Sequence, residues 1–253
     1  MDITILIGSI FISFLLISSI GIESFTLLFV NFDALFLVIG CTFAATLIHF
    51  PVTQVVRIWS RLKVLFSFKK YNYSNDIDYL INISKSIRTN GVQSIITNVN
   101  SCPDHFLKTG LQLLVDQIEF TELEKVLSLN ISYIQKRHLQ GIILFEQMAK
   151  YAPAFGLLGT TIGLVQLLAN LKDPSMIGQG MSIALVSTFY GILMANFIFS
   201  PIAGRLRAYS IEESFQREML KVGILAVAKN ESSVIVREKM MLFLTQKERK
   251  NEQ

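Results

Sequence analysis

Two long apolar runs lie close together in the second half of the chain. The first, at 151–171, reads YAPAFGLLGTTIGLVQLLANL, and the second, at 180–202, reads GMSIALVSTFYGILMANFIFSPI. The polar connection KDPSMIGQ separates them. Each run has just over twenty residues, which is long enough to cross a hydrocarbon core of about 30 Å. The pattern predicts a transmembrane hairpin over 151–202.

Small residues recur at steps of three and four along both runs. The first run has Ala152, Gly156, Gly159 or Thr160, and Gly163; the second has Gly180, Ala184, Ser187 or Thr188, Gly191 and Ala195. Such seams let two helix backbones approach closely. Neither seam contains Asp, Glu, Lys, Arg or His. An ion path along this hairpin would therefore need a carboxylate from another chain.

Two further apolar runs precede the hairpin. Residues 3–22 carry no charge and lack the basic start and small-residue cleavage site of a signal peptide, so we expect a retained first span. Residues 32–51 predict a second span, with Asp33 and His49 as interfacial residues near its two ends. The expected fold is an all-α integral membrane protein with four transmembrane helices and a large helical cytoplasmic insertion between the second and third.

The insertion begins with a basic amphipathic segment. Residues 52–70 hold five basic and no acidic residues, which suits a helix in the inner membrane interface. Apolar periodicity then predicts helices around 77–87, 107–118 and 123–134, with stops at Gly91 and at SCPD, 101–104, and another helix over 210–228. We expect four segments: 1–51 (spans 1 and 2), 52–150 (insertion), 151–202 (hairpin) and 203–253 (tail).

The placement of charge gives the orientation. Of the 23 Lys and Arg residues, 22 lie in 52–150 and 203–253, so these parts are expected in the cytoplasm. The net charge of +4 reflects this topology, and no basic stripe interleaves with stacking aromatic residues, which argues against nucleic-acid binding. Cys41 and Cys102 are expected to be free thiols.

Motifs of enzymes and metal sites are absent from the sequence. The three His residues are dispersed, and there is no HExxH, CxxC, P-loop or GxSxG. We therefore expect no enzymatic activity, no metal and no cofactor. Pro153 and Pro201 stand near the cytoplasmic ends of the third and fourth spans, where a proline is either a hinge or ordinary helix-end punctuation.

Several of these segments together resemble one known family. They are APAFGLLGTTIGLV, DPSMIG, STFYGILMAN followed by SPIA, LLVD at 113–116 and KRHLQG at 136–141. The chain closely resembles the MotA/PomA family of bacterial flagellar stator subunits. The motifs of the third and fourth spans are specific, whereas the first 100 residues match mainly in layout.

The resemblance implies a bacterial inner-membrane motor. Members assemble as five copies around two copies of a MotB- or PomB-like partner, whose single span carries the ion-binding Asp. Flow of H⁺ or Na⁺ then drives rotation against the rotor protein FliG. The partner's Asp would supply the carboxylate that the hairpin lacks.

The resemblance also assigns roles by position. Pro153 and Pro201 match the prolines that couple ion passage to movement, and Thr160 and Thr188 match hydroxyls of the ion path, which Gly159 and Gly163 are expected to line. Because hydroxyl and carbonyl oxygens suit Na⁺, these positions slightly favour sodium.

One position departs from the family pattern. Arg88 matches a basic rotor-facing position, but Ile96 stands where the family usually has Glu. Asp104, Glu119 or Glu122 are candidates to take over, or the rotor contact is weakened. Two alternatives remain: an ion-driven motor of the ExbB/TolQ kind that does not serve flagella, and a passive membrane scaffold.

Overall fold

The chain folds into two compact units, each assembled from two separate stretches of sequence. The computed structural model describes residues 3–21, 29–61, 73–102, 104–170, 174–244, 246 and 249. One unit comprises residues 1–68 and 139–207, and the other comprises residues 69–138 and 208–253. Every element in the described ranges is helical, as the sequence predicts.

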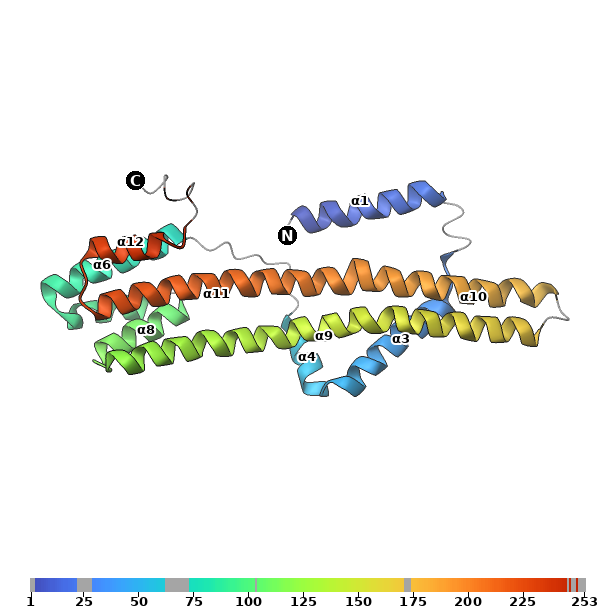
Figure 1. Ribbon diagram of the computed structural model, residues 1–253, viewed down its shortest axis with the longest axis horizontal. Helices are drawn as coiled ribbons and strands as arrows, with labels where there is room; N and C mark the ends of the chain where they lie inside the picture. Colours follow the sequence, from blue (N-terminus) through green and yellow to red (C-terminus); the bar gives the residue numbers. More distant parts are fainter. Residues whose placement is uncertain are drawn as a thin grey trace. The chain divides into compact units, whose positions relative to one another are not determined.

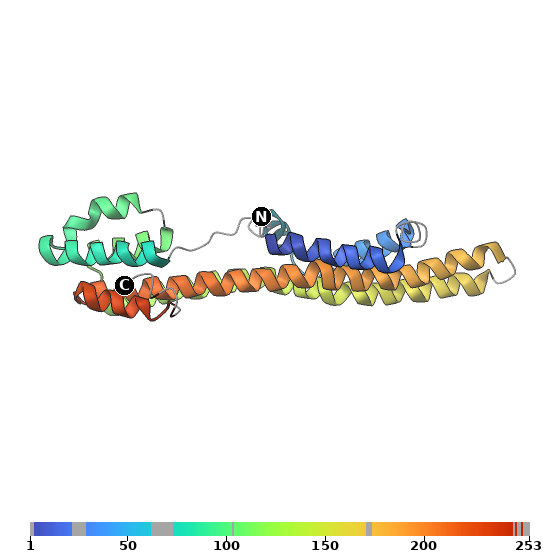
Figure 2. The ribbon, with the colours of Figure 1, turned by 90° about the horizontal axis from the view of Figure 1, so that it is seen from above.

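The first unit contains most of the apolar runs. Its helices are α1 (Ile3–Ile20), α3 (Phe32–His49), α4 (Val52–Arg61), the later part of α9 (Phe120–Ala169) and α10 (Pro174–Leu193). A π-helical turn, η2 (Met194–Phe199), joins α10 to α11 (Ser200–Ala228), whose first residues complete the unit. The apolar parts of α9 and α10 lie side by side in both views, and α3 packs against α10 (Figures 1 and 2).

The core of this unit lies where α3, α9 and the α10–α11 segment meet. Helix α3 begins where the Asn31 side chain caps it, accepting a hydrogen bond from the Ala34 amide at 3.1 Å. The buried apolar residues include Val38, Leu144, Phe145, Met148, Ala152, Ala195 and Phe199.

Three helices in the described part of the chain are long and apolar enough to cross a membrane. They are α3, α9 and the continuous segment from Ile177 to Ala228. The predicted first span folds as the uncharged helix α1. The interfacial helix predicted over 52–70 appears as α4 up to Arg61, and residues 62–72 lie outside the described residues.

The second unit is a cluster of shorter helices around the ends of α9 and α11. It contains α6 (Tyr73–Asn90), η1 (Val92–Ile95), α7 (Ile96–Ser101), α8 (His105–Val115) and α12 (Ser233–Met241). Its buried core includes Ile77, Leu80, Phe106, Leu111, Leu123, Leu127, Met219, Ile224 and Met240. The predicted stops are confirmed: α6 ends before Gly91, whose φ is +78°, and α7 ends at Ser101.

Three element boundaries differ from the sequence prediction. Helix α8 ends at Val115, so Ile118 lies in an exposed turn after Gln117, whose φ is +55°. Helix α10 begins at Pro174 rather than at Gly180, because proline suits the first turn of a helix. The third helix predicted for the insertion and the predicted third span form the single 50-residue helix α9.

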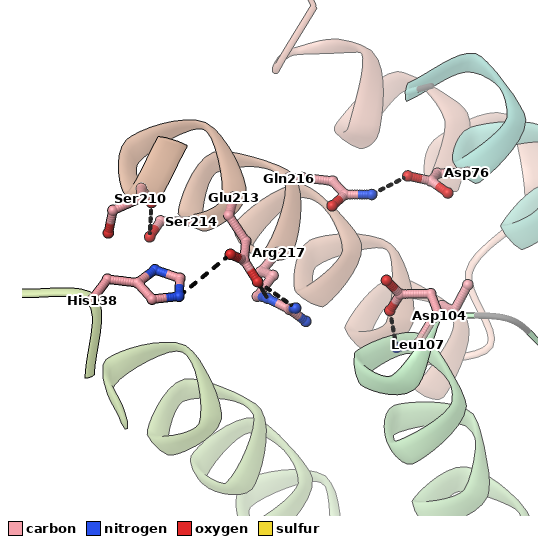
Figure 3. A network of polar contacts seen from close by, with 9 residues as sticks. All are labelled: Asp76, Asp104, Leu107, His138, Ser210, Glu213, Ser214, Gln216 and Arg217. Atoms are coloured by element: carbon pink, nitrogen blue, oxygen red, sulfur yellow. Dashed lines mark hydrogen bonds and ion pairs between the residues drawn. The ribbon is translucent and has the colours of Figure 1, made fainter. Parts of the chain in front are cut away.

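A network of polar contacts holds the second unit together (Figure 3). The Glu213 carboxylate accepts hydrogen bonds from Arg217 at 2.6 and 3.1 Å and lies 3.7 Å from Nε2 of His138. The guanidinium of Arg217 sits over the Phe106 ring, and Gln216 donates to Asp76 at 2.6 Å. These contacts join α6, α8 and α9 to α11.

Candidate functional site

The predicted seam between the third and fourth spans forms a close backbone contact. A methyl group added to Gly156 would lie 2.9 Å from the Ser187 carbonyl oxygen and 3.2 Å from the Cα atoms of Thr188 and Gly191. At Gly159 it would meet the Ser187 side chain and, 3.1 Å away, the side chain of Leu37 on α3. Three helices therefore converge at Gly159.

The contact continues toward the other end of the hairpin. A methyl group at Gly163 would lie 2.6 Å from both the Ala184 amide nitrogen and the Gly180 carbonyl oxygen. One at Gly180 would lie 3.0 Å from the Gly163 carbonyl oxygen. Gly163 has no room for a side chain, and a methyl group at Gly180 would force its neighbours to shift, so the small-residue pattern is confirmed as a packing motif.

Two hydroxyl groups face each other within this seam. Oγ1 of Thr160 on α9 hydrogen-bonds Oγ1 of Thr188 on α10. Thr160 also lies within donating distance of the Ala184 carbonyl at 3.0 Å and the Gly156 carbonyl at 3.2 Å, and Thr188 lies 3.4 Å from the same Gly156 oxygen. Four oxygen atoms from two helices are thus gathered at one level of the hairpin.

This oxygen cluster has no charged neighbour within the apolar runs of its own two helices. Residues 151–170 and 177–201 contain no Asp, Glu, Lys, Arg or His. Hydroxyl and carbonyl oxygens can replace part of the hydration shell of a cation, but they do not balance its charge in a low-dielectric medium. The cluster can therefore line an ion path, and a charge-balancing group has to come from elsewhere.

Pro153 lies in the seam itself. It is inside α9, where it supplies no amide hydrogen for the carbonyl four residues earlier. A methyl group on Gly191 would lie 2.6 Å from the Ala152 carbonyl oxygen and 3.1 Å from the Cα of Pro153. The proline turn of α9 therefore packs directly against the α10 backbone.

Pro201 lies next to a helix irregularity that the sequence did not reveal. The preceding turn, Met194–Phe199, is π-helical, and the Ser200 amide donates to the carbonyl of Ala195, five residues back. Pro201 follows the cap residue Ser200, and because it has no amide hydrogen it cannot form the α-helical bond to the Phe197 carbonyl. Both coupling candidates thus stand where the helix hydrogen bonding is interrupted.

The residues predicted to face the rotor lie in the second unit. Arg88 is exposed in the last turn of α6, where a cation suits the helix dipole. Asp104 accepts from the Leu107 amide at 2.9 Å and so caps α8. Glu119 accepts from the Thr121 hydroxyl at 2.8 Å, and Glu122 lies 3.5 Å from Lys125. Among the described contacts, none joins Arg88 to these carboxylates, and Ile96 is 42 % exposed.

Close to these helices, a tyrosine and a neighbouring cysteine have altered acidity. Burial raises the pKa of Tyr79 to about 12, with a smaller contribution from the neighbouring Cys102. Burial also raises the pKa of the Cys102 thiol, so both groups stay protonated at neutral pH. The Tyr79 hydroxyl donates to the Asn98 carbonyl at 2.9 Å, which ties α6 to α7.

The sequence reasoning missed two polar contacts that α3 and the residues just before it make with the hairpin. The Tyr190 hydroxyl donates to the Phe29 carbonyl at 2.5 Å and accepts from the Asn31 amide at 3.2 Å. At the other end of α3, His49 hydrogen-bonds Tyr151. The partners are more than 100 residues apart in the chain, so no local spacing could have indicated them.

Comparisons with known proteins agree with this architecture. Residues 98–219 match the family model described as the MotA/TolQ/ExbB proton channel family. Motility protein A of Borreliella burgdorferi is 34 % identical over 87 % of this chain and 85 % of its own length. Motility protein A of Cereibacter sphaeroides is 32 % identical over 98 % of this chain and 97 % of its own length.

A solved structure has the same fold over nearly the whole chain. The flagellar MotAB stator complex from Bacillus subtilis matches with a TM-score of 0.89 and 25 % identity, covering 99 % of this chain and 98 % of that one.

Proposed function

The chain belongs to the MotA/PomA family of flagellar motor stator subunits, and we propose that it forms the ion path of a stator together with a MotB-like partner. In this proposal four spans cross the inner membrane, with the second unit in the cytoplasm. The stator converts the flow of H⁺ or Na⁺ into torque on the rotor protein FliG. The subunit is proposed to assemble as a pentamer.

The observation that carries the proposal is the uncharged oxygen cluster in the α9–α10 seam. Thr160 and Thr188 offer oxygen ligands where two backbones are in contact, yet their spans carry no acid or base. A partner span bearing one Asp would complete the site, because a desolvated cation needs a compensating charge. We propose that Gly159 and Gly163 keep this part of the path narrow.

Sodium is the favoured ion in this proposal. Two hydroxyls and the carbonyls of Gly156 and Ala184 form a set of hard oxygen donors, which suits Na⁺, whereas a proton needs only the carboxylate and water. Moving one elementary charge through 100 mV releases about 2.3 kcal/mol. That free energy can bias a conformational step by more than about tenfold.

The prolines are proposed to transmit the conformational change caused by ion passage to the cytoplasmic helices. Pro153 sits against Gly191, and Pro201 follows the π-helical turn. A small change in the packing of the seam therefore alters the backbone at both prolines, where helix hydrogen bonds are missing. Arg88 is proposed as the rotor-facing cation. Because Asp104 caps α8, Glu119 and Glu122 are the better candidates for the missing carboxylate.

Co-expression with a MotB-like protein from the same genome tests the proposal. We expect swimming and ion flux with the native partner, and neither when the partner's membrane Asp is changed to Asn. Ion flux through this chain alone would contradict the proposal, since the hairpin has no charge of its own. Replacing external Na⁺ by K⁺ at constant voltage tests the ion, because unchanged motor speed would exclude sodium.

A second candidate function is an ExbB/TolQ-like motor that does not act on flagella. It is favoured by Ile96, which removes a carboxylate from the expected rotor-facing surface, and the matched family model also covers TolQ and ExbB. A complex that conducts ions with its partner but never restores swimming in a stator-deficient strain would favour this alternative.

A further inference from the structure

A hydrogen bond between α3 and α9 lies next to the Pro153 turn. Nδ1 of His49, the last residue of α3, is 2.5 Å from the hydroxyl oxygen of Tyr151. The two residues are 102 positions apart, and both belong to the first unit. Tyr151 stands two positions before Pro153, so the bond attaches the proline turn to the end of the neighbouring helix.

Ring contacts accompany the hydrogen bond on both partners. The imidazole stacks on the Phe50 ring with centroids 4.4 Å apart and an interplanar angle of 23°. The Tyr151 ring lies 6.1 Å from the imidazole and 6.5 Å from Phe155. The hydrogen bond therefore joins two aromatic groups that each lie beside another ring.

The same turn of α9 is also contacted from α10. Gly191 lies against the Ala152 carbonyl and the Cα of Pro153, where no larger residue fits. Pro153 supplies no amide hydrogen, so this turn has one helix bond fewer than its neighbours. The hydrogen bond from α3 thus acts at a turn that lacks one of its own helix bonds.

We propose that His49 is a positioning residue for torque generation: through Tyr151 it holds the Pro153 turn of α9 against α3. The inference rests on the proposed stator function. Under this proposal, ions enter the path without any role for His49. Their passage moves the proline turn reproducibly only when the bond from His49 to Tyr151 anchors that turn to α3. Loss of the bond therefore lowers the torque produced by the ion flow, while the ion flow itself continues.

The test uses substitutions that keep the rings. His49→Phe retains a ring to stack on Phe50 and Tyr151→Phe retains the ring contacts, while each removes one partner of the bond. One hydrogen bond shifts a two-state equilibrium by about fivefold. We expect stall torque to fall by about that factor, with ion flux through the partnered complex changed less than about twofold.

A double variant and a rescue separate positioning from general damage. Because both single changes break one bond, His49→Phe with Tyr151→Phe should lose no more torque than either alone. His49→Asn places an amide near the position of Nδ1, so its torque should be close to that of the wild type. His49→Gln, whose amide extends toward the position of Nε2, should lose as much torque as His49→Phe. Tyr133→Phe, an exposed tyrosine elsewhere on α9, is the matched control and should match the wild type.

Each remaining outcome overturns the inference. Additive losses, failure of His49→Asn to restore torque, or parallel losses of flux and torque would show that the bond does not position the turn. In those cases the wild-type complex still conducts ions and swims, and the proposed function stands. A wild-type complex without ion flux would overturn both.

Discussion

Thr160 and Thr188 share a hydrogen bond across the contact between α9 and α10. They are 28 residues apart in the chain, and the glycines around them let the two backbones come close enough for short side chains to meet. Each hydroxyl also has a backbone carbonyl within hydrogen-bonding distance. Rotation of either threonine side chain therefore changes which oxygen atom its hydroxyl contacts.

Removing one of these hydroxyls should weaken ion binding without disturbing the packing. Thr160→Val keeps the shape and removes the oxygen, so we expect sodium-dependent flux at low Na⁺ to fall about tenfold, corresponding to the loss of about 1.4 kcal/mol. Thr160→Ser should retain most of the flux. Thr161→Val is the control, because that exposed hydroxyl bonds only its own helix at Leu157. Equal flux in the two Val variants would count against an ion-path role.

Enlarging Gly163 should destabilise the hairpin. The added methyl group of Gly163→Ala would lie 2.6 Å from two backbone atoms of α10, which have little freedom to move. We expect a loss of about 1–3 kcal/mol in stability, the usual cost of overpacking, measured by thermal unfolding of the purified complex in detergent. Gly178→Ala on α10 is the matched control, since its methyl group would meet nothing within 4 Å. A variant as stable as this control would contradict the close contact.

The polar network of the second unit should contribute more than its exposed ion pairs. Arg217 and Glu213 have side chains only 16 % and 21 % exposed, whereas Lys125 and Glu122 are 67 % and 54 % exposed. Arg217→Gln leaves the Glu213 carboxylate and the Phe106 ring without their cation, so we expect about 1–3 kcal/mol of destabilisation. Lys125→Gln should cost less than about 1 kcal/mol. Chemical denaturation followed by circular dichroism measures the free energy of unfolding of both variants. Equal losses in Arg217→Gln and Lys125→Gln would show that the network contributes no more than the exposed ion pair.

Stability should fall at alkaline pH through Tyr79 and Cys102. Because burial raises the pKa of Tyr79 to about 12, the folded chain keeps a proton that the unfolded chain releases near pH 10. The stabilisation is complete below pH 10 and is lost as pH rises toward 12, and the raised pKa of Cys102 acts in the same direction from lower pH. Tyr79→Phe should therefore show a shallower decline of melting temperature between pH 10 and 12. An unchanged decline would mean that other groups control it.

The helical fold and the small-residue seam could be predicted because both depend on local periodicity. Ile77 and Leu80 are buried as the 3.6-residue period requires, and Gly156 and Gly163 meet α10 as their spacing indicates. The period could not locate the helix ends, as Ile118 and the start of α10 show. Turn geometry after Val115 and the proline at 174 decide those ends.

Contacts between distant parts of the chain could not be predicted from the sequence. The bond between His49 and Tyr151 and that between Gln216 and Asp76 depend on how whole helices pack, and neither pair has a spacing that marks it. The resemblance to a family predicts that Thr160 lines the ion path, but only the packing of the helices shows that it meets Thr188.

Pro201 should influence torque through the π-helical turn that precedes it. In Met194–Phe199 the backbone bonds reach five residues back, and Ser200 donates to Ala195. Pro201→Ala restores an amide hydrogen that can bond the Phe197 carbonyl, which favours an α-helical turn and opposes the widened one. We expect torque to fall at least about tenfold, because the helix is then held in the α-helical pattern and no longer forms the π-helical turn. The amount of protein in the membrane should stay unchanged. Bead assays of single motors measure the torque, and immunoblots of membranes measure the amount. Gly204→Ala, one turn later with nothing within 4 Å of the added methyl, should leave both unchanged. Normal torque in Pro201→Ala would show that the proline only marks the helix and takes no part in coupling.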